Sequence, residues 1–203
     1  MSHPAVVLFS LFLGLYLGRL WWRDRASARE GRPLPGALPG ATDAPRTVIL
    51  AGLAGGLILV AVETMGELAL GIAAQQSTMT WLFALYSVAA APLIEELIFR
   101  GWLVVLDRGA AAKWAAALGA SVVFAALHPF LWRWDDAGFV LTLDTKGWFS
   151  TGIVFATSIW LYALRLGRWN PQRSLLPCFT GHAAKNFGVV AVKAATGFMG
   201  GAW

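Results

Sequence analysis

Six apolar runs divide this chain of 203 residues, and each is close to the length that crosses a lipid bilayer. A helix that spans the hydrocarbon core needs about 20 consecutive residues that are mostly apolar. The runs cover roughly residues 4–22, 47–72, 79–106, 114–131, 147–166 and 175–199. The sequence therefore predicts an all-α fold, a polytopic membrane bundle of about six transmembrane helices.

The composition supports the same class, because 58% of the residues are hydrophobic and only 13% are charged. A soluble domain carries about 25% charged residues. The single cysteine, Cys178, excludes an intramolecular disulfide framework and a metal cage built from thiolates.

The positive charge is placed unevenly along the chain. Eleven of the sixteen basic residues flank alternate connections between the runs: Arg19, Arg23, Arg25, Arg29, Arg32, Arg46, Arg108, Lys113, Arg165, Arg168 and Arg173. By the positive-inside rule these connections face the cytoplasm, so both termini are predicted to lie outside. The basic excess thus orients the protein and implies no nucleic-acid partner. Abundant Ala, Gly, Arg and Trp suggest GC-rich DNA and a prokaryotic plasma (inner) membrane.

Three parts are predicted along the chain. Residues 1–22 form an N-terminal membrane span, which we interpret as a retained anchor because no Lys or Arg precedes its apolar run. Residues 23–46 form a basic cytoplasmic linker, rich in Pro and Gly, that we expect to be extended and partly disordered. Residues 47–203 form the helical core.

Ionisable residues inside the apolar runs indicate where chemistry takes place. Glu95, Glu96 and Arg100 lie in the third run, and His128 and His182 lie in the fourth and sixth. Charged groups at membrane depth are costly and normally face a protein interior or a wet cavity. A rise of about 1.5 Å per residue places Glu95, His128 and His182 in one layer near mid-bilayer. We therefore expect them to meet in one pocket.

Helical spacing pairs several of these residues. Glu96 and Arg100 are four apart and should form an ion pair, while Glu95 points about 100° away. His128 shares a face with Phe124, and His182 shares a face with Asn186.

A second set of charges lies in the second and sixth runs. Glu63 and Glu67 are predicted to form a structural ion pair with Lys193, and the alternative for this set is a role that faces the substrate. Lys185 should reach a partner glutamate or extend toward the membrane surface.

Three motifs in order carry a family resemblance. Glu-Glu-x-x-x-Arg (95–100), Phe-x-x-x-His (124–128) and His-x-x-x-Asn (182–186) resemble the motifs of the CPBP family of intramembrane glutamic proteases. This family is also called ABI, or type II CAAX prenyl endopeptidase-like. The resemblance covers 92–186, and the first two runs carry no motif.

The resemblance implies a role for each motif residue. Glu95 and His128 would activate a water molecule, and His182 and Asn186 would stabilise the oxyanion. Supporting roles would fall to Glu96, Arg100 and Phe124. Spacing alone does not choose between Glu95 and Glu96 as the base.

No cofactor is expected on this interpretation. The alternative is a metal site formed by Glu95, His128 and His182, because Glu and His are ordinary zinc ligands. The chain lacks the His-Glu-x-x-His motif of zincin-like metalloproteases.

The predicted function is an intramembrane endopeptidase that hydrolyses a peptide bond in a membrane-anchored protein or peptide. The alternative hypothesis is a non-catalytic bacteriocin-immunity or membrane scaffold protein, whose polar core only holds its helices together.

Overall fold

The computed structural model describes residues 3–136 and 138–203, and it is an all-α bundle with one small hairpin. The elements in chain order are α1 (Pro4–Arg29), α2 (Arg46–Ala69), the short 3-10 helix η1 (Ala73–Gln75), α3 (Trp81–Ala89), α4 (Ala91–Glu96), the π-helical η2 (Leu97–Trp102), α5 (Ala110–Leu127), β1 (Trp132–Asp135), β2 (Gly138–Leu141), α6 (Thr145–Leu166) and α7 (Leu176–Ala195). The predicted fold class is confirmed.

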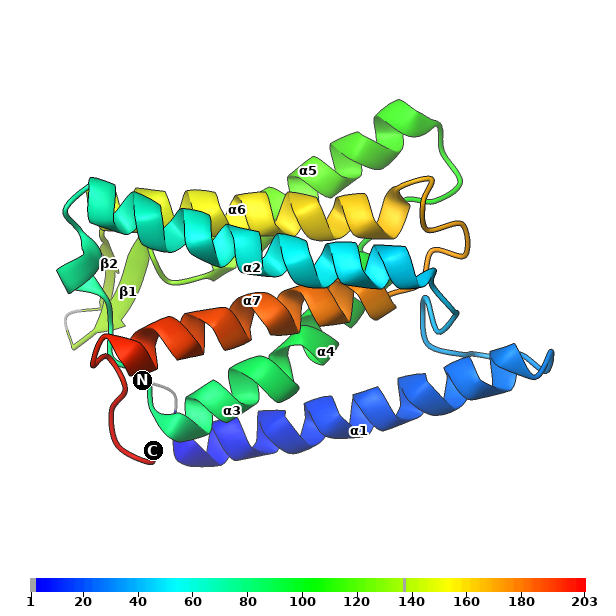
Figure 1. Cartoon of the computed structure of the whole chain (residues 1–203), viewed down its shortest axis with the longest axis horizontal. Coiled ribbons are helices and arrows are strands. Elements are labelled where there is room, and N and C mark those ends of the chain that lie inside the picture. Colours follow the sequence, from blue (N-terminus) through cyan, green and yellow to red (C-terminus); the bar gives the residue numbers. More distant parts are fainter. Residues whose placement is uncertain (1–2, 137) are drawn as a thin grey trace.

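The long helices run back and forth between two ends of the bundle, as Figure 1 shows. The start of α1, the C-terminus, η1 and the antiparallel β1–β2 hairpin lie at one end, here called the hairpin end. The connections after α1, η2 and α6 lie at the other end, here called the linker end. Each predicted run thus crosses the bundle once.

Within the described residues, five helical segments are long and apolar enough to span a membrane. They are α1, α2, Trp81–Trp102, α5 and α6. The sixth predicted run does form a helix, α7, but α7 does not reach the same hydropathy. Its buried residues include His182, Lys185 and Lys193, so its polar side chains face protein rather than lipid.

Burial follows the pattern expected for a protein surrounded by lipid. Leu57 and Ile58 on α2 are exposed, whereas Glu67 on the same helix is buried. Glu96 and Arg100 are fully buried. Apolar side chains cover the outside of the bundle and charged groups lie within it, which is how ionisable residues are tolerated in membranes.

Helices α2 and α7 pack closely because glycines line their contact. A Cβ on Gly56 would overlap the carbonyl oxygen of Gly181, and one on Gly52 would overlap that of Pro177. Small residues of this kind let two membrane helices bring their backbones together. The contact fixes α7, the helix that carries the third motif, against α2.

The linker differs from the prediction of an extended, partly disordered segment. Helix α1 continues to Arg29, beyond the predicted span end at residue 22, and the chain that follows folds back on it. Trp21 Nε1 donates to Pro39 O at 3.1 Å, and the buried Asp24 accepts from Leu38 N at 2.9 Å. A buried carboxylate and an indole therefore hold this segment against α1.

Candidate active site

The third predicted run is broken into three pieces that set the direction of its carboxylates. Helix α3 ends at Ala89, and Ala90 leaves the helical region with φ −121° and ψ −42°. Pro92 lies in the first turn of α4, where its missing N–H costs no helical hydrogen bond. Glu95 and Glu96 follow in the last turn of α4.

The π-helix η2 after these carboxylates leaves backbone carbonyls that side chains of α6 satisfy. Tyr162 Oη lies 2.6 Å from Phe99 O and 3.1 Å from Leu103 O, and its single proton donates to the nearer carbonyl, that of Phe99. Arg165 Nε donates to Arg100 O at 3.1 Å. Single turns of π-helix occur often at functional sites. Here the turn helps to orient Arg100.

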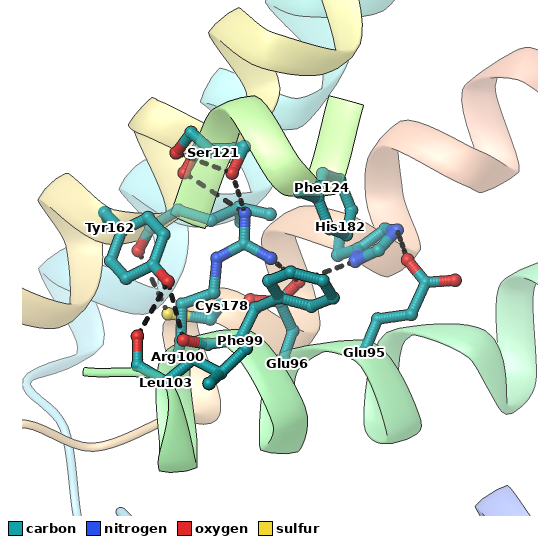
Figure 2. A network of polar contacts seen from close by, with 12 residues as sticks. Glu95, Glu96, Phe99, Arg100, Leu103, Ser121, Phe124, Tyr162, Cys178 and His182 are labelled. Atoms are coloured by element: carbon teal, nitrogen blue, oxygen red, sulfur yellow. Dashed lines mark hydrogen bonds and ion pairs between the residues drawn. The ribbon is translucent and has the colours of Figure 1, made fainter. Parts of the chain in front are cut away.

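Glu96 and Arg100 form the predicted ion pair at the centre of a polar network (Figure 2). Arg100 Nη1 lies 3.2 Å from Glu96 Oε1, and neither side chain is exposed. Arg100 Nη2 also donates to Ser158 Oγ at 2.5 Å, and Ser158 Oγ donates to Ser121 Oγ at 2.8 Å. The guanidinium lies 4.6 Å from the centre of the Phe124 ring. A buried charge is stable only when it is compensated in this way.

His182 on α7 lies between the two adjacent carboxylates. Its Nδ1 is 2.7 Å from Glu96 Oε1, and its Nε2 is 3.8 Å from Glu95 Oε2. An ionised carboxylate can only accept a hydrogen bond, so Nδ1 carries the proton and donates to Glu96. The opposite nitrogen, Nε2, therefore faces Glu95, as Figure 2 shows.

The two glutamates differ in their surroundings. The side chain of Glu96 is fully buried, whereas that of Glu95 is 26% exposed and lines a cavity. Glu95 Oε2 accepts no hydrogen bond from any residue in the described part of the chain. Glu95 is thus the carboxylate that a ligand in the cavity can reach.

The cavity has a volume of about 650 Å³ and brings together residues from distant parts of the sequence. Its wall includes the four predicted catalytic residues Glu95, His128, His182 and Asn186. Asn186 Nδ2 donates to Ser87 O at 2.7 Å, which leaves its second amide N–H available. The predicted convergence of three helical segments on one pocket therefore matches the geometry.

His128 is not inside a helix, contrary to the prediction. Helix α5 ends at Leu127, and His128 adopts φ −78° and ψ 126°. The cause is Pro129, because a proline disfavours helical geometry in the residue before it. His128 Nδ1 lies 2.8 Å from Phe124 O.

Phe124 packs against both histidines of the cavity. Its ring centre lies 4.8 Å from that of His128 and 6.3 Å from that of His182. An edge-on contact with Phe99 at 4.9 Å holds it in place. The Phe124 ring of the Phe-x-x-x-His motif thus forms the apolar wall between the cavity and Arg100.

Several polar residues at the site were not predicted. Ser121, Ser158 and Tyr162 complete the network around Arg100, yet each is an isolated hydroxyl in an apolar helix. The one indication in the sequence is that each is a polar residue within an apolar run, and this does not identify the group that it contacts.

The predicted ion pair between Lys193 and the α2 glutamates is wrong. Lys193 Nζ donates to Ser77 O at 2.6 Å, and Glu63 pairs instead with Lys185 Nζ at 3.0 Å. Glu67 pairs with Lys146. Helical depth alone did not distinguish Lys185 from Lys193, although the expectation of a partner glutamate for Lys185 is confirmed.

Within residues 3–136 and 138–203, no group of three or more His, Cys, Asp or Glu side chains is arranged to hold a metal ion.

Comparison with known proteins gives a family. The family model described as Type II CAAX prenyl endopeptidase Rce1-like matches residues 77–188, which is more than half of the chain and includes all three motifs. No curated protein matches the chain. No solved structure matches it either. With its long apolar helices and this match, the chain is an integral membrane protein that belongs to the type II CAAX prenyl endopeptidase Rce1-like family.

Proposed function

We propose that the protein is an intramembrane endopeptidase that hydrolyses a peptide bond of a membrane-anchored protein or peptide. The family points to a protease of the CAAX endopeptidase kind. The observation that carries the mechanism is the contrast between neighbouring carboxylates. Glu96 is fully buried and bonded through Oε1 to Arg100 and His182, whereas the side chain of Glu95 is 26% exposed and lines the cavity.

Glu95 is the proposed general base. The 3.8 Å between Glu95 Oε2 and His182 Nε2 is too long for a direct hydrogen bond and too short to hold a water between them. The proposed water therefore contacts Glu95 from the cavity, where its side chain is 26% exposed. Glu95 takes a proton from this water while the water oxygen attacks the carbonyl carbon of the substrate. His128, which lines the same cavity, holds the water or relays its proton.

Asn186 and His182 are the proposed donors to the oxyanion that forms. Asn186 has a second amide N–H, and His182 donates from Nδ1 to Glu96. The Nε2 of His182 would be a second donor in the form of the imidazole that carries a proton on both nitrogens. Donors fixed in advance stabilise the developing charge strongly. When the tetrahedral intermediate collapses, the C–N bond breaks and the proton held by Glu95 passes to the leaving amine.

The deciding experiment compares membrane proteomes from cells that express the wild type or Glu95→Gln, and reads out new protein termini. We expect cleavage products in the wild type only. Glu30→Gln is the matched control, because Glu30 is exposed in the linker and should leave cleavage intact. If Glu95→Gln and His128→Ala both cleave a verified substrate at the wild-type rate, the proposed mechanism is wrong.

Metal dependence is the competing mechanism for the same residues. Exhaustive chelation of the purified protein tests it, and we expect full activity to remain. Loss of activity that added zinc restores would instead assign Glu95, His128 and His182 as ligands.

One observation favours the non-catalytic scaffold as a second candidate. The network of Glu96, Arg100, Ser158 and Ser121 is buried completely, as a purely structural polar core would be. A scaffold requires that motif substitutions abolish function by lowering stability. If Glu95→Gln abolishes function while the melting temperature is retained, the scaffold hypothesis fails.

A further inference from the structure

The cavity continues from the candidate active site toward the hairpin end, where its wall becomes charged. The charged groups there include Glu63 and Glu67 of α2, Lys146 of α6, and Lys185 and Lys193 of α7. This part of the cavity is not used by the proposed hydrolysis, so its charges call for a separate account.

Two of the three lysines have a carboxylate partner. Lys185 Nζ lies 3.0 Å from Glu63 Oε2, and Lys146 Nζ contacts Glu67 Oε1. The other oxygen of Glu67 accepts from Gln76 Nε2 at 2.7 Å. Both α2 glutamates are therefore engaged.

Lys193 differs from the other two lysines. Lys193 is only 8% exposed, and its Nζ donates to the carbonyl oxygen of Ser77 at 2.6 Å. The ammonium also lies 5.8 Å from the Phe198 ring. Among the described residues it has no carboxylate within ion-pair distance. An ammonium has three N–H donors, and a buried cation is stabilised by an anion.

The position of Lys193 relates it to the site. Lys193 is eleven residues beyond His182 on α7, which is about 16 Å along the helix. An extended peptide rises about 3.3 Å per residue, so about five residues bridge this distance. Val189 and Val192 line the cavity between them and offer an apolar wall to such a peptide.

We propose that Lys193 binds a carboxylate of the substrate about five residues from the bond that is cleaved. This inference rests on the proposed endopeptidase function. The carboxylate belongs either to the free C-terminus of the peptide or to an acidic side chain. The segment between it and the cleaved bond is apolar, to match Val189 and Val192.

A binding experiment tests this without requiring cleavage. The full-length Glu95→Gln protein in nanodiscs of zwitterionic lipid is titrated with N-acetylated penta-alanine as the free acid or the amide. We expect the acid to bind about tenfold more tightly, as for one partly desolvated charge pair. A third peptide, amidated but with glutamate at its last position, distinguishes an acidic side chain from a free C-terminus.

Three further variants are made in the same background. Lys193→Met should bind acid and amide equally, whereas Lys193→Arg should keep the preference because it keeps the charge. Lys113→Met is the matched control, because Lys113 begins α5 near the linker end, away from the cavity wall. Its preference should equal that of the Glu95→Gln parent.

The proposal is overturned if Lys193→Met keeps the preference for the acid, or if the parent shows none. It is also overturned if anionic lipid in the nanodiscs, or added inorganic phosphate, saturates Lys193 and removes the preference for the acid over the amide peptide. Lys193 would then be a phosphate-binding residue. With Glu95 restored, Lys193→Met should raise KM and leave kcat unchanged for acid-ended peptides. Carboxylate-dependent binding without any cleavage would refute the endopeptidase proposal and leave the carboxylate site standing.

Discussion

At the scale of single residues, Glu95 and Glu96 are adjacent in sequence and distinct in environment. The rotation of about 100° between successive helical residues directs Glu96 into the bundle and Glu95 into the cavity. Glu96 compensates a buried guanidinium and orients an imidazole. The same substitution at the two positions should therefore have different effects.

Glu96→Gln should destabilise the fold, whereas Glu95→Gln should not. Removing the Glu96 charge leaves Arg100 buried without its counter-ion, which costs about 3–5 kcal/mol. Thermal unfolding of both variants in the same detergent measures the difference. Equal melting temperatures for the two variants would contradict the structural role assigned to Glu96.

The sequence predicted side-chain contacts correctly where both partners lie on the same helix. The spacing of Glu96 and Arg100 predicted their ion pair correctly. For residues on different helices the individual partner could not be predicted, because spacing along one helix says nothing about the rotation and depth of another. The pairing of Lys193 with Ser77 O and the contact of Arg100 with Ser158 are examples.

At the scale of elements, prolines and glycines decide where helices end and how closely they approach. The bend before Pro92 and the end of α5 before Pro129 place Glu95 and His128 at the same cavity. The third run, predicted over residues 79–106, is broken at Ala90 in the structure. Pro129 follows His128 directly in the sequence, but the prediction that His128 lies within a helix did not take the effect of this proline into account.

Gly56→Ala should weaken the contact between α2 and α7. The added Cβ would overlap the carbonyl oxygen of Gly181, and overpacking of this kind costs about 1–3 kcal/mol. Gly119→Ala on α5 is the matched control, because nothing lies within 4 Å of the added atom there. Since alanine is also the better helix former, Gly119→Ala should leave stability unchanged or raised.

Unfolding midpoints of the two glycine variants provide the measurement. A Gly56→Ala protein as stable as Gly119→Ala would mean that the helices separate easily at this point. The tight α2–α7 contact would then contribute nothing to the position of His182.

At the scale of the whole molecule, the two ends of the bundle differ in charge and in content. The start of α1, the C-terminus and the hairpin lie at one end, and the basic linker lies at the other (Figure 1). The distribution of Arg and Lys predicts that the linker end faces the cytoplasm. The cavity section around Lys193 belongs to the opposite, hairpin end.

Cysteine labelling of intact cells tests this orientation. Ala202→Cys lies at the hairpin end, and Gly109→Cys lies in open space at the linker end. We expect a membrane-impermeant maleimide to label Ala202→Cys in intact cells and Gly109→Cys only after permeabilisation. Native Cys178 is fully buried and should stay unlabelled. The reverse pattern would show that the termini face inward.

The sharing of Glu96 Oε1 has a consequence for how this chain can diverge. The atom lies 3.2 Å from Arg100 Nη1 and 2.7 Å from His182 Nδ1, so one oxygen joins two motifs. A mutation that shifts α7 along α4 would break the contact between His182 and Glu96. A mutation that removes Arg100 would change the surroundings of the Glu96 carboxylate, to which His182 donates. Descendants of this sequence should therefore exchange Glu96, Arg100 and His182 together or keep all three.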